Sequence, residues 1–275
     1  MTSSRDLDEG QQHDEAFKDQ ISPTLDRKRN AFSELMSPKP KQAKQIQPQQ
    51  HNHPRDARNG LLPYILNPTS FSSDIVIQHN ENTVLIRDAF PKATVHLLLL
   101  PRDSTKWHIN PRDAFDDAVF LAMVQKEAAE ALQLAASELS RLIGPYSESC
   151  KARIAAMESD DPPAELPTGR DFSQEFKVGV HAHPSMNHLH VHIISRDMYS
   201  ERLKHQKHYN SFNTDFFIPL GDFPLAKGDP RRQTSYQNAN LKKDYKCWRC
   251  GQGFANKFAA LKAHLQEEFR TWRKE

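Results

Sequence analysis

The sequence contains few cysteines and no long apolar run. Its 275 residues include three cysteines, Cys150, Cys247 and Cys250. These are too few for a disulfide framework, which predicts a reducing compartment. No stretch reaches the roughly 18 apolar residues of a membrane span, and the N-terminus lacks the apolar segment of a signal peptide. We therefore expect a soluble, intracellular protein.

Net charge and hydrophobic content are also low. The formal charge of +2 is nearly neutral, so a basic surface can arise only from local clustering of cations. Hydrophobic residues make up 37% of the chain and the mean hydropathy is -0.76. Both values are low for a chain that is folded throughout, so we expect part of it to be disordered. The length allows one or two domains.

Residues 1–57 carry few aliphatic side chains and many Gln, Asp, Pro, Ser and Lys. They cannot bury enough surface to offset the entropy of ordering, which predicts a disordered tail. Two basic clusters, 27–29 and 39–44, are spaced like a bipartite nuclear import signal. The alternative is a solvated charge run.

The segment 58–215 has the periodicities of a compact α+β domain. Period-two and continuous apolar patterns predict strands, and a helical apolar stripe predicts a long helix that is broken at most once. Pro- and Ser-rich composition predicts an exposed loop over 144–168. The expected elements are a short helix at 59–65, strands at 75–78, 83–87, 95–101 and 176–182, and the long helix at 113–142.

The stretch 187–195 alternates three histidines with apolar residues. In a β-strand the imidazoles of His188, His190 and His192 would line one face, while Leu189 and Val191 would be buried on the other. Such a row fits an exposed polar face, a metal site or phosphate chemistry. Phosphate chemistry is favoured because imidazole is a nucleophile, an acid or a base near neutral pH.

Several residues then form a wider pattern. It comprises Asp88 eight positions before His96, the turn with Lys92 between them, His181 opening a loop that contains Ser185, and the three alternating histidines. This pattern resembles the histidine-triad family of nucleotide hydrolases and transferases. More narrowly, 181–186 and 207–213 resemble the aprataxin-like family of DNA deadenylases, and the resemblance spans about 58–269. It implies the histidine-triad fold, an antiparallel sheet with helix cover.

The resemblance implies a role for each histidine. His190 would attack the phosphorus of an adenylate and form a covalent adenylyl-histidine. His188 would orient His190, and His192 would contact the phosphate oxygens. His181 would stabilise or protonate the departing DNA 5′-phosphate. No catalytic metal is expected, since imidazoles and backbone amides supply the charge stabilisation.

The same resemblance implies three substrate-binding residues. Asp88 matches a ribose-binding carboxylate, Ser185 would donate a hydrogen bond to the phosphate, and Lys92 belongs to the same substrate site. His96, on an apolar strand, is expected to be a hydrogen-bonded structural histidine.

A second module is predicted near the C-terminus. Cys247 and Cys250 are followed after 13 residues by His264, with apolar residues between. This spacing predicts a small ββα-like zinc finger with structural zinc. No histidine follows His264, but Glu268 stands one helical turn on, and its carboxylate can complete a tetrahedral site. Glu267 is the competitor, with the poorer helical phase, and a finger that has lost its metal is the alternative.

Basic residues cluster just before and within the C-terminal segment 216–275. Lys204, Lys207 and His208 lie beside Tyr209, and we expect these four to contact DNA. Further expected phosphate contacts are Arg231, Arg232, Lys242, Lys243 and Lys246. The helix at 59–65 resembles the family's wedge on the terminal base pair, with Leu61, Leu62 or Tyr64 as its tip.

The leading hypothesis is a nuclear, monomeric DNA-repair hydrolase that releases AMP from 5′-adenylated nicks or ends. One alternative is a hydrolase of dinucleoside polyphosphates or nucleoside phosphoramidates, which would need no finger. Another is a catalytically inactive zinc-finger adaptor, which the complete histidine set argues against. A metal-dependent hydrolase is the weakest, since no carboxylate base is evident beside the histidine strand.

Overall fold

The computed structural model describes residues 56–275. Residues 1–55, with both basic clusters of the predicted import signal, lie outside this part of the chain. No helix within 56–275 is long and apolar enough to span a membrane.

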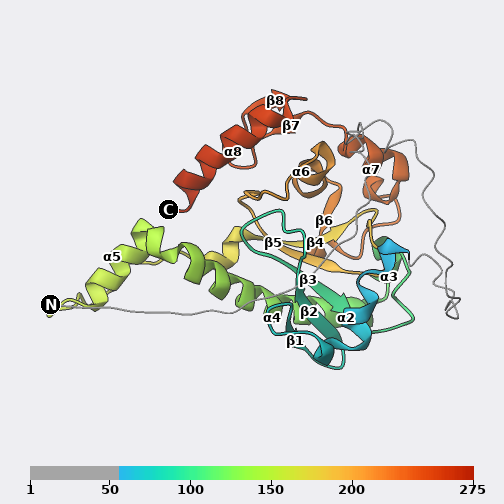
Figure 1. The fold of residues 1–275 in the computed structure, drawn as a ribbon, viewed down its shortest axis with the longest axis horizontal. Helices are drawn as coiled ribbons and strands as arrows, with labels where there is room; N and C mark the ends of the chain where they lie inside the picture. Colours follow the sequence, from blue (N-terminus) through green and yellow to red (C-terminus); the bar gives the residue numbers. More distant parts are fainter. Residues whose placement is uncertain (1–55) are drawn as a thin grey trace, which may run out of the picture. The chain divides into compact units, whose positions relative to one another are not determined.

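A six-stranded antiparallel sheet forms the centre of the fold, as predicted (Figure 1). The spatial order is β1-β2-β3-β5-β4-β6, so the histidine strand β5 is internal. The strands are β1 (Val76–His79), β2 (Thr83–Arg87), β3 (His96–Pro101), β4 (Phe176–His181), β5 (Val191–Ser195) and β6 (Phe217–Pro219). Because β6 pairs with β4, the sheet extends past residue 215, where the sequence predicted the catalytic domain to end.

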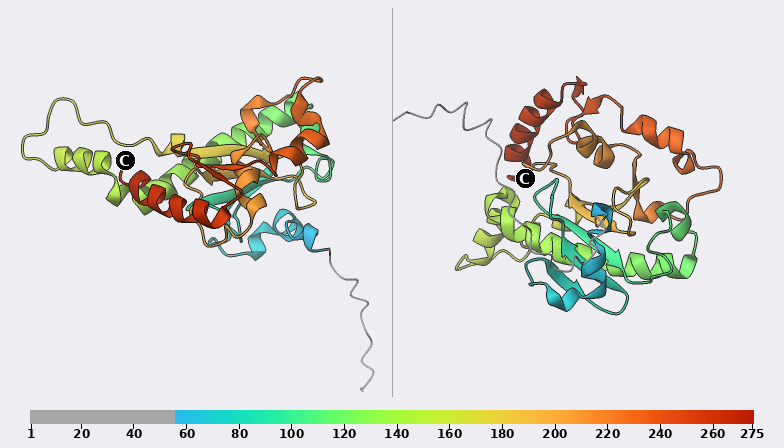
Figure 2. Two further views of the ribbon diagram at one scale, coloured as in Figure 1. Left: turned by 90° about the horizontal axis from the view of Figure 1, so that it is seen from above. Right: turned by 45° about the vertical axis from the view of Figure 1, so that its right-hand side comes forward.

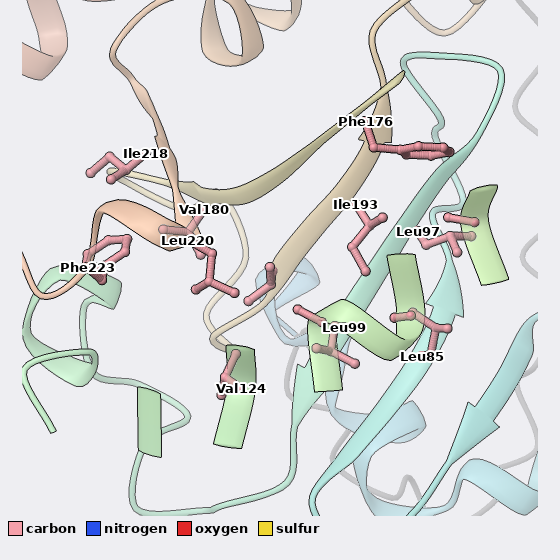
Figure 3. Packing of buried hydrophobic residues seen from close by; sticks show 14 of the residues in the cluster. Leu85, Leu97, Leu99, Val124, Phe176, Val180, Ile193, Ile218, Leu220 and Phe223 are labelled. Carbon is pink, nitrogen blue, oxygen red and sulfur yellow. The ribbon is translucent and has the colours of Figure 1, made fainter. Parts of the chain in front are cut away.

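The long helix covers one face of this sheet and is interrupted once, as expected. It consists of α3 (Pro111–Ala114) and α4 (Ala118–Ile143), and Asp117 caps α4 by accepting from the N–H groups of Val119 and Phe120. Alternate strand residues, including Leu97, Leu99 and Ile193, pack against α4 (Figure 3). This packing leaves the other face of β3, β5 and β4 free to carry polar side chains.

One glycine lets β6 approach β4 closely. A Cβ on Gly179 would lie 2.3 Å from the carbonyl oxygen of Ile218 and 2.8 Å from the Phe217 ring. Gly179 also pairs with His192 across the sheet. Any larger residue would therefore displace β6 and the aromatic wall beside the histidines.

The remaining helices of the catalytic part are short. They are α2 (Leu62–Leu66), α5 (Glu148–Met157) and α6 (Gln206–Asn213). The prediction of a loop throughout 144–168 was wrong for α5. Ser147 caps this helix through the N–H of Cys150, and residues 148–157 are mostly helix formers. The Ser-Asp-Asp-Pro-Pro run that suggested a loop begins only after the helix ends.

The histidine strand is shorter than predicted. Pairing of β5 with β3 ends at Val191, opposite Leu99. The N–H of Leu189 donates instead to the carbonyl of Trp107, at 2.8 Å. His188 and His190 therefore lie in the segment that leads into β5, and only His192 is within the strand.

The C-terminal module has the predicted hairpin and helix: β7 (Tyr245–Lys246), β8 (Gly253–Ala255) and α8 (Phe258–Trp272), preceded by α7 (Thr234–Asn240). It packs on the catalytic part through buried groups. Trp272 is 1% exposed, joins the main core, and donates through its indole N–H to Glu175 at 2.8 Å. The end of α8 also lies beside α5, where the N–H of Glu148 donates to the Lys274 carbonyl (Figures 1 and 2).

Candidate active site and zinc finger

A cavity of about 540 Å³ opens on the sheet face opposite α4. Its walls come from segments far apart in the sequence: β2 and the turn after it, β3, the 181–186 loop, the histidine segment and α6. The polar side chains of the catalytic pocket are Tyr64, Arg87, Asp88, Lys92, His96, His181, His183, Ser185, His190, His192, Lys207, His208 and Ser211. The structure thus brings together all the predicted catalytic and substrate-binding residues except His188.

The imidazole of His190 is fixed by the backbone. Its Nδ1 lies 2.7 Å from the carbonyl oxygen of His188, and a carbonyl can only accept, so Nδ1 carries the proton. The lone pair of His190 is therefore on Nε2. Burial lowers the pKa of His190, which favours the neutral, nucleophilic ring.

His188 makes the orienting contact predicted for it, and it does so through its backbone. The carbonyl of His188, not its imidazole, orients His190. The buried His188 ring instead packs against Trp107 and His108, with ring centroids 5.7 and 4.9 Å away. It does so because His188 precedes the regular strand, so strict alternation does not hold there.

A hydrogen-bonded chain runs behind the catalytic histidine. His96 Nε2 lies 3.0 Å from His192 Nδ1. On its other side, His96 Nδ1 lies 3.3 Å from the N–H of Lys92 and 3.4 Å from a carboxylate oxygen of Asp88. His96 is thus a hydrogen-bonded buried histidine, as expected, and it links the backbone of Lys92 to His192.

Burial keeps this histidine cluster neutral. Desolvation lowers the pKa of His96 to about 4, and it lowers the pKa values of His181 and His192 well below the ordinary range. Neighbouring imidazoles act in the same direction, since two positive rings side by side repel. An anionic ligand in the pocket would favour the protonated rings and raise these pKa values.

This burial predicts acid-labile folding. The histidines are neutral in the folded state but take up protons near pH 6.5 when unfolded, so the free energy of unfolding should fall as pH drops below 6.5. For His96 the fall should continue to about pH 4, at up to about 1.4 kcal/mol per pH unit.

Urea titrations at pH 7.5 and 5.5 measure this change in the free energy of unfolding. His96→Asn should have a shallower pH dependence than His205→Asn, an exposed control; equal slopes would refute the assignment.

The substrate-binding candidates occupy two walls of the pocket. Asp88 accepts from the N–H of Phe90 at 2.7 Å, which fixes its carboxylate. The ammonium of Lys92 donates to the Phe90 carbonyl, and burial lowers its pKa. Ser185 stands on the opposite loop, exposed, and its own carbonyl accepts from Arg58 Nε at 3.4 Å.

A buried aspartate that was not predicted from the sequence fixes the backbone after Lys92, which forms one wall of the pocket. Asp197 Oδ2 accepts from both the N–H and the hydroxyl of Thr94, and its Oδ1 accepts from the Ser195 hydroxyl at 2.5 Å. Burial raises the pKa of Asp197, the reverse of what an exposed carboxylate shows. Its place two residues after the histidine strand was the available signal.

The short helix α2 forms the rim of the pocket. Leu61, just before it, and Tyr64 line the cavity, whereas Leu62 does not. Leu61 is buried at 6% exposure, and Tyr64 packs on Phe71 with ring centroids 4.4 Å apart. Of the three wedge candidates, Tyr64 is therefore the partly exposed side chain at the rim.

One predicted DNA contact was wrong. Tyr209 is 1% exposed, its hydroxyl donates to the Lys246 carbonyl at 2.7 Å, and the same oxygen accepts from the Trp248 N–H at 3.0 Å. Tyr209 therefore joins α6 to the finger and faces away from solvent. The three other predicted DNA contacts remain accessible: Lys207 and His208 line the catalytic pocket, and Lys204 is exposed.

Two further residues predicted to contact phosphate are paired with carboxylates of the fold. Arg231 pairs with Asp222 at 2.5 Å and with Asp229 at 2.8 Å. Arg232 pairs with Asp116 at 2.5 Å and donates to the Leu225 carbonyl. Both guanidinium groups are neutralised within the fold, whereas Lys242, Lys243 and Lys246 are exposed.

The predicted metal ligands do meet. Cys247, Cys250, His264 and Glu268 place one ligand atom each within 4.8 Å of all the others. Cys250 Sγ lies 3.2 Å from His264 Nε2, which lies 3.1 Å from a Glu268 oxygen. Ligands of a tetrahedral zinc ion are separated by about 3.5 Å, so this donor set fits zinc. The competitor Glu267 pairs with Arg270 instead.

Two family models match the chain. A HIT-domain model matches residues 71–199, and a C2HE / C2H2 / C2HC zinc-binding finger matches residues 213–271. The chain is 36% identical to an aprataxin-like protein of Schizosaccharomyces pombe, over 78% of this chain and 82% of the relative. It is 35% identical to an aprataxin-like protein of Saccharomyces cerevisiae, over 78% of this chain and 96% of the relative.

Solved structures agree with these matches. The structure described as Hnt3 in complex with DNA and guanosine superposes with a TM-score of 0.62 at 32% identity, over 78% of this chain and 97% of that one. The aprataxin orthologue Hnt3 from Schizosaccharomyces pombe superposes with a TM-score of 0.55 at 32% identity, over 77% and 92% of the two chains.

Proposed function

This chain belongs to the aprataxin-like family of histidine-triad hydrolases of DNA repair, and we propose that His190 removes AMP from adenylated DNA 5′ ends through a covalent intermediate. One observation carries the proposal. The His188 carbonyl holds the proton of His190 on Nδ1, so that the Nε2 lone pair is the reactive one, in a pocket lined by other imidazoles.

In the first step, His190 Nε2 attacks the phosphorus of the adenylate. A P–N bond forms, and the P–O bond to the DNA 5′-phosphate breaks with its electron pair on the departing oxygen. His181 has a buried Nε2 with no hydrogen-bond partner among the described residues. In our proposal its neutral N–H donates to the departing phosphate, and the Ser185 hydroxyl donates to the same group.

The histidine chain determines what His192 offers. If His96 Nδ1 accepts from the Lys92 N–H, then His96 Nε2 carries the proton and donates to His192 Nδ1. His192 then carries its own proton on Nε2, which has no partner among the described residues. We assign this N–H to a non-bridging phosphate oxygen, and we assign Asp88 to the ribose hydroxyls.

In the second step, water attacks the adenylyl phosphorus. The P–N bond breaks with its electron pair returning to His190 Nε2, one proton of the water passes to the DNA 5′-phosphate released in the first step, and AMP leaves with the oxygen of the water. The DNA retains a 5′-phosphate, which a ligase can use. No step uses a metal ion.

Zinc in this proposal is structural. The ion would be held by Cys247, Cys250, His264 and Glu268, and it would cross-link the hairpin to α8. The exposed Lys242, Lys243 and Lys246 then contribute sequence-independent contacts to DNA phosphates. We further propose a monomer that acts in the nucleus, with a catalytic domain near 58–215 and the DNA-binding module after it.

A substrate comparison tests the proposal. The wild-type chain should release AMP from a nicked duplex carrying a 5′-adenylate at least about 10-fold more efficiently, by kcat/KM, than it cleaves a dinucleoside polyphosphate, because only DNA contacts the exposed cations. Steady-state assays of both substrates measure this. Turnover of the dinucleotide alone would favour the small-nucleotide hydrolase. Binding of DNA ends without turnover of either substrate would favour the inactive adaptor.

A further inference from the structure

A second cavity lies on the far side of the catalytic loop 183–187. It has a volume of about 360 Å³, and we call it the rear cavity. His183 and Met186 line both it and the catalytic pocket, so the two share a wall. Its polar side chains are Arg58, His108, Asn110, His183 and Asn187.

The side chains of the rear cavity are held in place and are dominated by donors. Arg58 Nε donates to the Ser185 carbonyl, and His108 Nδ1 lies 3.3 Å from the Asn187 carbonyl. Among the described residues, no hydrogen bond engages the terminal nitrogens of Arg58 or the Nε2 of His108, so these atoms can bind a ligand. No carboxylate is among the described residues that line the cavity. Such a lining suits an anion.

One unpartnered buried nitrogen belongs to the cavity wall, and a second unpartnered ring packs on that wall. His188 is 1% exposed, and neither of its ring nitrogens has a hydrogen-bond partner among the described residues. The His108 ring, which lines the cavity, packs on His188 at 4.9 Å. His183 Nε2 is likewise buried without a described partner. Buried polar groups are normally hydrogen-bonded, so these nitrogens point to a ligand or ordered water that takes part in binding.

We propose that the rear cavity binds a phosphodiester of the DNA strand whose 5′ end is adenylated, downstream of the scissile bond. The inference rests on the proposed function, since it concerns the same substrate. Ser185 faces the catalytic pocket, and Arg58 holds its carbonyl from the rear cavity. A strand whose 5′-phosphate lies at Ser185 passes over this loop, and the next anionic groups along it meet Arg58 and His108.

The site has a consequence for specificity. A small nucleotide has no phosphodiester downstream of its leaving group, so it gains nothing from the rear cavity. Adenylated DNA gains a charge-assisted contact that small substrates lack, which adds to discrimination in kcat/KM.

The test uses the full chain with its zinc and the variant Arg58→Ala/His108→Ala. For a nicked duplex with a 5′-phosphate, the variant should bind roughly 10-fold more weakly, and the slope of log K against log salt should fall by about 1. Lys126→Ala, an exposed cation on α4, is the matched control and should leave both values unchanged. An unchanged salt slope in the Arg58→Ala/His108→Ala variant would overturn the proposal.

Neutral methylphosphonate linkages then locate the phosphate. In the wild type, one linkage near the 5′ end of the adenylated strand should weaken binding by a similar factor, and that linkage should have no further effect in the Arg58→Ala/His108→Ala variant. Non-additivity at a template-strand linkage would overturn the strand assignment, and full additivity everywhere would overturn the site. Failure of the proposed function is a separate result, because it shows as loss of AMP release by the wild type.

Discussion

Replacing His190 with alanine is expected to reduce AMP release from adenylated DNA by about 10³-fold or more. The substitution removes the only ring whose free nitrogen is defined by a backbone carbonyl within the described part of the catalytic pocket. His192 and His181 are not expected to substitute, because in our proposal both rings donate an N–H to the phosphate groups, and burial keeps them neutral. Single-turnover assays with enzyme in excess measure the effect.

Two controls make this prediction specific. Circular dichroism should show that His190→Ala is folded. The substitution removes part of one cavity wall but breaks no backbone pairing of the sheet. His188→Ala keeps the carbonyl that orients His190, so it should retain far more activity than His190→Ala. Equal loss of activity in two folded variants would contradict the assignment of the backbone carbonyl as the orienting group.

Removing the metal is expected to destabilise the catalytic part as well as the finger. Zinc binding contributes on the order of 10 kcal/mol to the folding of isolated fingers. Here the finger is also an anchor, because Tyr209 bonds to Lys246 and Trp248 beside Cys247, while Trp272 lies in the main core. Cys247→Ser or a strong chelator should therefore lower Tm by more than about 5 °C and reduce both DNA binding and turnover. Thermal unfolding with and without chelator measures the shift.

The neighbouring glutamates supply the matched pair. Glu268→Gln should lose zinc, which metal analysis would show, whereas Glu267→Gln should keep it because Glu267 pairs with Arg270 on the surface. Zinc retention in Glu268→Gln together with loss in Glu267→Gln would contradict the ligand assignment. Unchanged Tm after complete removal of zinc would contradict the anchoring role.

Local patterns predicted much of the fold. The continuous apolar run at 95–101 was predicted to be a strand, and every residue of β3 is buried. The long helix is present, with one break, and the Cys, His and Glu spacing of the finger brings the four predicted ligands together. These features depend on residues close in sequence, whose periodicity is visible without the fold.

Features that depend on distant contacts could not be predicted. The role of Tyr209 depends on Lys246 and Trp248, and the neutralisation of Arg232 depends on Asp116, more than a hundred residues away. The ring of His188 turns toward Trp107 because β5 begins only at Val191. A basic run or an alternating pattern predicts which residues lie on a surface or in a strand. Contacts with distant parts of the chain decide which of their charged groups and rings remain available for a ligand.

Transfer of labelled AMP from DNA to the protein is the most direct test of the central claim. A nicked duplex with a labelled 5′-adenylate is mixed with excess enzyme, quenched at short times in alkaline detergent, which preserves a phosphorus–nitrogen bond, and digested for mass spectrometry. The account predicts transient label on the peptide that contains His190, which then decays to free AMP. AMP formation at full rate without any protein-bound label, or with label on another residue, would contradict the account.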